Sequence, residues 1–207
     1  DEEIDTELDS DTEKKFVSKV KEIVSSKKIH AIIFEDYDKG CITNKVINEI
    51  VDLANKKNIV SLVDPKKRNF SNYKNVTLFK PNFKELVEGM KSEITKGDFE
   101  GIFEISKKLQ KKLSAKYMMV TLSELGVFVG DRESYEIVPA EIRDIADVSG
   151  AGDTMISIAS LCLAAGLEPV DIATISNIAG GLVCEKIGVV PVEKKNLLIE
   201  CLDKFVE

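Results

Sequence analysis

The residues with the clearest chemical potential are Gly150-Ala151-Gly152-Asp153, which lie where a loop enters a long apolar segment with helical character. Two glycines let the backbone turn tightly and approach a ligand without a Cβ in the way. The first N–H groups of a helix have no partner within it, and the helix dipole favours negative charge there. The amides of residues 150–153 can therefore hold an anionic phosphoryl group, while the Asp153 carboxylate accepts a proton from an attacking hydroxyl. The same four residues also fit a simpler role, an aspartate at a helix N-terminus behind a flexible glycine turn.

The elements that must position this turn alternate between strands and helices. Short apolar runs predict buried strands at 29–34, 59–63, 76–79 and 117–122, and a hairpin at 126–129 and 135–138. Apolar residues at helical spacing predict helices at 13–28, 43–54, 83–90, 101–113, 150–165, 169–187 and 193–205. This alternation predicts an α/β fold with a mostly parallel sheet and helices on both faces. Such sheets bind ligands beyond the carboxyl ends of their strands, where the polar motifs of this chain fall.

The length of 207 residues fits one domain with a substantial core, or a large piece of one. Residues 1–12 are acidic and without periodicity, which predicts an exposed lead-in or a cut edge ahead of a domain at 13–207. The lysines at 107, 108, 111 and 112 recur on one predicted helix and indicate a solvated face.

Composition argues against several classes of function. A net charge of -7 disfavours a surface that tracks nucleic acid or anionic lipid. No apolar run approaches the roughly 20 residues needed to cross a bilayer. The acidic start is the opposite of the basic beginning of a signal peptide, so we expect a cytoplasmic enzyme without nucleic-acid or membrane partners. The four cysteines form no Cys-x-x-Cys pair, and three lie in apolar, helix-like segments, which favours buried thiols over a disulfide or zinc site.

Three motifs in order resemble those of the ribokinase (PfkB) family of carbohydrate kinases. The stretch from Asp147 to Thr154 resembles the C-terminal signature of that family, and Pro81-Asn82-Phe83-Lys84-Glu85 looks like its Asn-x-x-Glu motif. The stretch from Thr121 to Val127 is similar to the Thr-x-Gly-x-x-Gly nucleotide loop, with Ser123 where glycine is usual. The resemblance implies a ribokinase-like fold with ATP and Mg²⁺, and it allows for a monovalent cation near the 147–153 loop.

The resemblance also implies roles for individual residues. Asp153 would be the general base, and the anion hole would be formed by Gly150, Ala151 and Gly152. Asn82 and Glu85 would organise Mg²⁺ and phosphate through bridging waters. The implied nucleotide contacts are Thr121, Ser123, Gly126 and Asn177, the last from a stretch, 177–181, that resembles the adenine-side helix of the family.

Within the family, the likeness extends to the kinases that phosphorylate D-glycero-D-manno-heptose 7-phosphate on O1 in bacterial ADP-heptose synthesis. Residues 36–40, Asp-Tyr-Asp-Lys-Gly, look like their Asp-Tyr-Gly-Lys-Gly loop, and residues 63–66 resemble their Val-Asp-Pro-Lys segment. Asp38 and Lys80 depart from the pattern. A sugar that already carries a phosphate needs cationic anchors. Lys39 and Lys66 are candidate anchors of this kind, and the resemblance of the two segments adds Asp36 and Asp64 as candidate substrate contacts.

The resemblance covers only the later part of such a kinase, because the glycine-rich sugar-binding segment and small β-lid that begin family members do not appear before Asp1. We therefore expect an uncovered sheet edge that favours self-association or a homo-oligomer. Three interpretations stay open. The chain transfers the γ-phosphoryl of ATP to O1 of heptose 7-phosphate, or it acts on another sugar or sugar phosphate. Alternatively, it is a nucleotide-binding fragment or interaction module without turnover.

Overall fold

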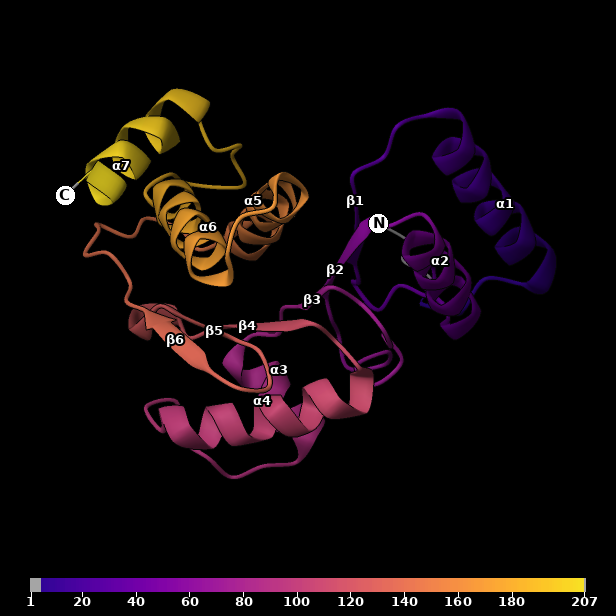
Figure 1. Cartoon of the computed structure of the whole chain (residues 1–207), viewed down its shortest axis with the longest axis horizontal. Helices are drawn as coiled ribbons and strands as arrows, with labels where there is room; N and C mark the ends of the chain where they lie inside the picture. The colour runs from indigo at the N-terminus through magenta and orange to yellow at the C-terminus, as the bar shows by residue number, and fades with distance from the viewer. Residues whose placement is uncertain (1–4, 207) are drawn as a thin grey trace.

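A six-stranded sheet forms the centre of the computed structural model, which describes residues 5–206 (Figure 1). Its strands lie in chain order: β1 (Ala31–Glu35), β2 (Val60–Asp64), β3 (Leu78–Phe79), β4 (Tyr117–Thr121), β5 (Val127–Gly130) and β6 (Tyr135–Val138). The first four pair in parallel, and β5 and β6 continue the sheet as an antiparallel hairpin. The predicted mostly parallel sheet is confirmed, and β1 forms one of its edges.

One face of the sheet is covered by α2 (Asn44–Lys56), α3 (Phe83–Met90) and α4 (Phe99–Leu113). Apolar side chains of these helices, such as Ile47, Leu86 and Leu109, bury against strand residues such as Phe34 and Phe79. The helix α1 (Ser10–Ser26) packs on α2, on the outside of this layer (Figure 1).

The opposite face is covered by α5 (Ala151–Ala165) and α6 (Pro169–Cys184), while α7 (Lys194–Val206) packs on α6 (Figure 1). Leu62 and Met119 of the sheet meet Ile156 and Ile172 of these helices in a second buried cluster. The two clusters explain why β2 and β4 are buried along most of their length, since strands covered on both faces have no solvent side.

Several predicted boundaries were wrong by a few residues. The helix α1 begins at Ser10 because the Asp9 carboxylate accepts from the amides of Asp11 and Thr12 at 3.0 Å each. The end of the predicted lead-in, 1–12, is therefore helical, and its first four residues lie outside the described part. The strand β1 continues to Glu35, beyond the predicted end at residue 34, and α6 ends at Cys184 rather than at 187.

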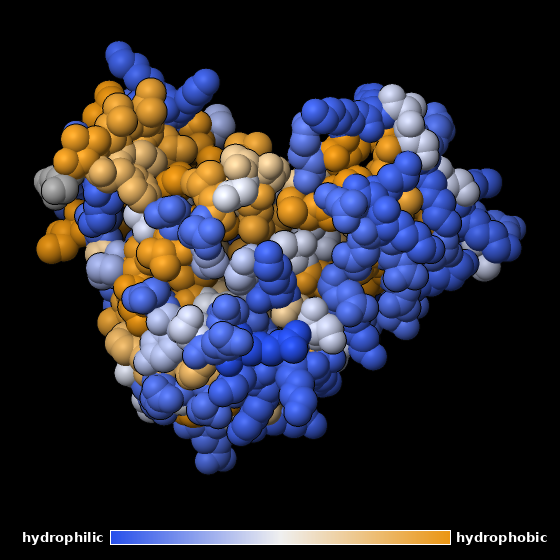
Figure 2. Space-filling model, in the orientation of Figure 1, coloured by the Kyte–Doolittle hydropathy of each residue, from blue (hydrophilic) through white to orange (hydrophobic). Residues whose placement is uncertain are grey.

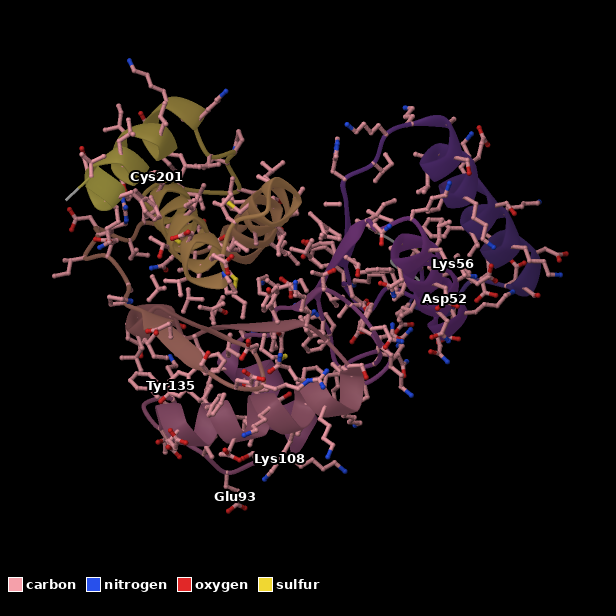
Figure 3. The ribbon with its side chains drawn as sticks, viewed as in Figure 1. Asp52, Lys56, Glu93, Lys108, Tyr135 and Cys201 are labelled. Atoms are coloured by element: carbon pink, nitrogen blue, oxygen red, sulfur yellow. The ribbon has the colours of Figure 1, made fainter. Side chains whose placement is uncertain are left out.

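One side of the molecular surface is hydrophilic and another is apolar (Figure 2). Hydrophilic side chains cover the side of α1–α4, and Lys108 on α4 points into solvent, as expected for a solvated helix face (Figures 2 and 3). Apolar side chains gather over α7, where Leu198, Leu202 and Phe205 are exposed (Figure 2). All four cysteines are free. Cys162 and Cys184 are buried as predicted, whereas Cys201, the third cysteine in an apolar helical segment, is only partly buried. Among residues 5–206, no helix is both long and apolar enough to cross a membrane.

Candidate active site

Four charged side chains meet where the carboxyl ends of three parallel strands face the start of α5. Glu35 ends β1, Asp64 ends β2 as its register partner, Lys80 follows β3, and Asp153 lies in the first turn of α5. The carboxylates of Glu35, Asp64 and Asp153 each place an oxygen within 4.8 Å of the others. The fold thus brings Asp153, predicted as a base, to the strand ends where parallel sheets bind ligands.

A buried ion pair lies beside the glycine turn. The Nζ of Lys80 is 2.7 Å from Oδ2 of Asp64, and the two side chains are only 3% and 9% exposed. A Cβ built on Gly152 would lie 3.7 Å from Lys80 Nζ and 3.5 Å from Asp64 Oδ2. The Lys80 ammonium is therefore adjacent to the predicted anion hole, although the sequence identified this lysine only as a departure from a motif.

Glu35 is the residue of this group that the sequence did not predict. Burial and the charges of Asp64 and Asp153 together raise the pKa of its carboxyl to about 7, against the opposing effect of Lys80. Near neutral pH the Glu35 carboxyl is therefore divided between its protonated and ionised forms. The predicted strand end at residue 34 assigned Glu35 to a polar loop and hid its position.

Asp153 accepts a hydrogen bond from a neighbouring loop. The Oη of Tyr37, just after β1, donates to Asp153 Oδ2 at 2.8 Å. This bond, together with burial, raises the pKa of the Tyr37 phenol to about 12, so Tyr37 remains a donor at neutral pH. The sequence placed Tyr37 inside a matched motif but assigned it no role.

The turn before α5 is fixed by its own contacts. Gly150 caps the helix with φ of 77°, in the left-handed region that favours glycine. The Asp147 carboxylate accepts from the amide and hydroxyl of Ser149 and from the Gly188 amide, and these bonds lower its pKa. The Ala151 amide donates to the Val148 carbonyl at 3.3 Å. Of the three residues of the predicted anion hole, Gly152 is the one whose Cβ position lies near Lys80.

The Asn-x-x-Glu motif forms a capping box at the start of α3. Asn82 Oδ1 accepts from the Glu85 amide, and Glu85 Oε2 accepts from the Asn82 amide, each at 2.8 Å. Lys66 Nζ lies 2.8 Å from Glu85 Oε1 and 3.3 Å from Asp64 Oδ1, and so joins this cap to the charged cluster. Burial lowers the pKa of the Lys66 ammonium, but its two carboxylate partners raise it more. The predicted link of Asn82 and Glu85 to Mg²⁺ stays a prediction.

The predicted nucleotide loop lies next to this cap. Thr121 forms a parallel bridge with Asn82, and its amide donates to the Pro81 carbonyl at 3.2 Å. Ser123 has φ of 54°, in the left-handed region, which gives a physical reason for the glycine usual at this position. Gly126, with φ of 89°, has no room for a side chain because a Cβ would overlap the Val138 carbonyl oxygen.

The other predicted contacts have different surroundings. Asp36 is buried, and its Oδ2 accepts from Tyr73 Oη at 2.6 Å and from Asn69 Nδ2 at 3.0 Å, so its carboxylate anchors the loop from within. Lys39, in the same loop, is exposed. Asn177 on α6 donates to the Pro139 carbonyl at 2.9 Å. The structure therefore brings Asp64 to Asp153 and links Lys66 and Glu85 to it through ion pairs, whereas the Asp36 carboxylate is buried among Tyr73 and Asn69.

Solved structures with a similar fold are sugar kinases of ribokinase type. Phosphofructokinase-2 from Escherichia coli in complex with potassium matches with a TM-score of 0.82 at 20% identity, over 95% of this chain and 63% of that one. Arabidopsis thaliana ribokinase complexed with ribose and ATP matches with a TM-score of 0.73 at 17% identity, over 94% and 60%. At these identities the likeness establishes the ribokinase-like fold.

The sequence profile of the pfkB family of carbohydrate kinases matches residues 3–195, and the chain belongs to this family. Among its relatives, the bifunctional protein HldE of Campylobacter jejuni is 39% identical over 162 residues, which are 78% of this chain and 34% of that protein. HldE of Aliarcobacter butzleri is 34% identical over 182 residues, or 88% and 37%. The chain thus spans about a third of the length of these curated relatives.

Proposed function

We propose that this chain provides the ATP-binding and phosphoryl-transfer part of a kinase that phosphorylates O1 of heptose 7-phosphate. The observation that carries the proposal is the position of Asp153, at the first turn of α5 and within 4.8 Å of the Glu35 and Asp64 carboxylates at the strand ends. A carboxylate beside helix amides and a buried ammonium is arranged to accept a proton next to an anionic phosphoryl group.

Each residue of the cluster has a proposed role. Asp153 takes the proton of the sugar hydroxyl as its oxygen attacks the γ-phosphorus. The Gly152 amide, at the start of α5, and the Lys80 ammonium stabilise negative charge on the transferring group, since the Cβ position of Gly152 is only 3.7 Å from Lys80 Nζ. Thr121, next to Asn82, lies on the proposed nucleotide side.

A divalent cation fits the donors present. Magnesium prefers carboxylate and water oxygens, and Glu35, Asp64 and Asp153 each place a carboxylate oxygen within 4.8 Å of the others. Both Asp64 oxygens already contact lysines, Lys66 and Lys80, so Glu35 and Asp153 are the better candidates for direct contact. Both oxygens of Glu85 already accept hydrogen bonds, one from Lys66 and one from the Asn82 amide. Glu85 would therefore contact the cation through a water molecule. The cation would offset charge on the phosphates. A monovalent cation near the 147–153 loop remains a further proposal.

Gly152→Ala tests this assignment. An alanine Cβ here would make ordinary van der Waals contacts, and alanine is about 1 kcal/mol better than glycine inside a helix, so the fold should be retained. The added methyl would occupy the space between the Gly152 backbone and Lys80. We expect calorimetry to show MgATP binding in the wild type and at least about tenfold weaker binding in the variant. Equal affinity in a folded variant would refute the proposed phosphate position.

Asp153→Asn tests the role of the base in any form of the protein that phosphorylates heptose 7-phosphate. Loss of a general base should reduce turnover by about 10² to 10⁴ and leave MgATP affinity nearly unchanged. Transfer to another sugar phosphate but not to heptose 7-phosphate would revise the substrate alone. Binding of MgATP without any transfer would instead favour a nucleotide-binding module, consistent with the share of the relatives that this chain covers.

A further inference from the structure

We propose that the Tyr37 hydroxyl occupies the position of the acceptor alcohol on Asp153 and so keeps this base from activating water until a sugar displaces it. The inference rests on the proposed role of Asp153. Tyr37 Oη donates to Asp153 Oδ2 at 2.8 Å, an ordinary distance for an O–H···O hydrogen bond. An acceptor alcohol must make the same contact before it transfers its proton.

The loop that carries Tyr37 has a fixed backbone and a side chain that can move. The buried Asp36 carboxylate is held by Tyr73 and Asn69, and it accepts from the Asp38 amide at 2.9 Å. The Tyr37 side chain, between these anchors, is 55% exposed. Rotation of its ring toward solvent therefore breaks one hydrogen bond without disturbing the loop. Glu35, the other carboxyl close to Asp153, is half-buried at the end of a strand and lacks this freedom.

The contact matters because water can replace the sugar as acceptor. In that reaction the water oxygen bonds to the γ-phosphorus, the bond to the bridging oxygen of ADP breaks, and Asp153 takes a proton from the water. The products are ADP and inorganic phosphate. Water must first displace Tyr37 from Oδ2, whereas a sugar is also bound through its other groups. A hydrogen bond to a charged group is strong enough to shift the competition between Tyr37 and water for Asp153 Oδ2 on the order of tenfold or more.

The test compares ADP release from MgATP, without sugar, by the wild-type chain and Tyr37→Phe. We expect Tyr37→Phe to release ADP on the order of tenfold faster, because it removes only the hydroxyl that covers Asp153. Tyr135→Phe is the matched control, since Tyr135 Oη also lies near a carboxylate, 3.5 Å from Glu100, but on β6 (Figure 3). Its ADP release should equal that of the wild type.

A double variant, Tyr37→Phe with Asp153→Asn, separates the outcomes. The added hydrolysis should disappear in it, because the reaction requires the Asp153 carboxylate. If Tyr37→Phe binds MgATP in calorimetry but releases ADP no faster than the wild type, the inference is wrong. An increase that survives Asp153→Asn would equally overturn it. Absence of MgATP binding in the wild type would instead remove the proposed function, and this inference with it.

Discussion

The carboxyl of Glu35 gives the site a measurable dependence of stability on pH. Its pKa is raised from 4.5 to about 7 in the folded chain. The folded state thus binds this proton more tightly than the unfolded state, and stability falls as pH rises from about 4.5 to about 7. The shift corresponds to at most about 3.4 kcal/mol, and the half-exposed position of Glu35 reduces this to about 1–2 kcal/mol. Glu35→Gln removes the ionisation and should stabilise the fold by that amount at pH 8, with little effect near pH 4.5.

Urea unfolding of the wild type and Glu35→Gln at both pH values, with EDTA present, measures this difference. Glu133→Gln, at an exposed position in the β5–β6 turn, is the control and should change stability equally at both pH values. Destabilisation of Glu35→Gln at pH 8 would refute the reasoning. It would mean that an ionised Glu35 is needed as a counter-charge for Lys80.

Three further predictions concern the fold and its association. Lys80→Met should destabilise the chain by up to about 3–5 kcal/mol in urea unfolding, because it leaves buried Asp64 with Lys66 as its one remaining cationic partner, whereas Lys66→Met, at a 35% exposed side chain, should cost less. Ser123→Gly should stabilise the chain by up to about 1 kcal/mol in the same assay, since Ser123 has φ of 54°. The edge strand β1 and exposed apolar side chains such as Leu161, 66% exposed on α5, should cause self-association, and Leu161→Glu should reduce it in light scattering without loss of stability.

The sequence predicted the elements and the glycine turn well because both have local causes. Apolar spacing marks each strand and helix, and Gly150 and Asp153 stand at a helix start that the sequence makes plain. The contacts of Glu35 and Lys80 were not predicted, because they depend on the order of β1, β2 and β3 in the sheet and on α5 above it. Contacts between residues far apart in the chain leave no periodic pattern in the sequence. Asn82 and Glu85 were identified through a family motif as candidates for the Mg²⁺ and phosphate network. Their spacing also has a local explanation, because it is the spacing of a helix capping box.

The balance of charge around Asp153 leads to a last prediction, on the form of nucleotide that binds. Asp64 and Asp153 carry two negative charges, Lys80 offsets one of them, and ionised Glu35 adds another. The charge of Lys66 is shared between Asp64 and Glu85. Free ATP would therefore bring its phosphates toward carboxylates that still repel them, whereas MgATP brings a cation that those oxygens can approach. Calorimetry should show binding with Mg²⁺ and a loss of at least about tenfold in affinity when EDTA removes it. The same titration with Lys80→Met should widen that gap, and equal binding with and without Mg²⁺ would show that the carboxylates do not face the phosphates.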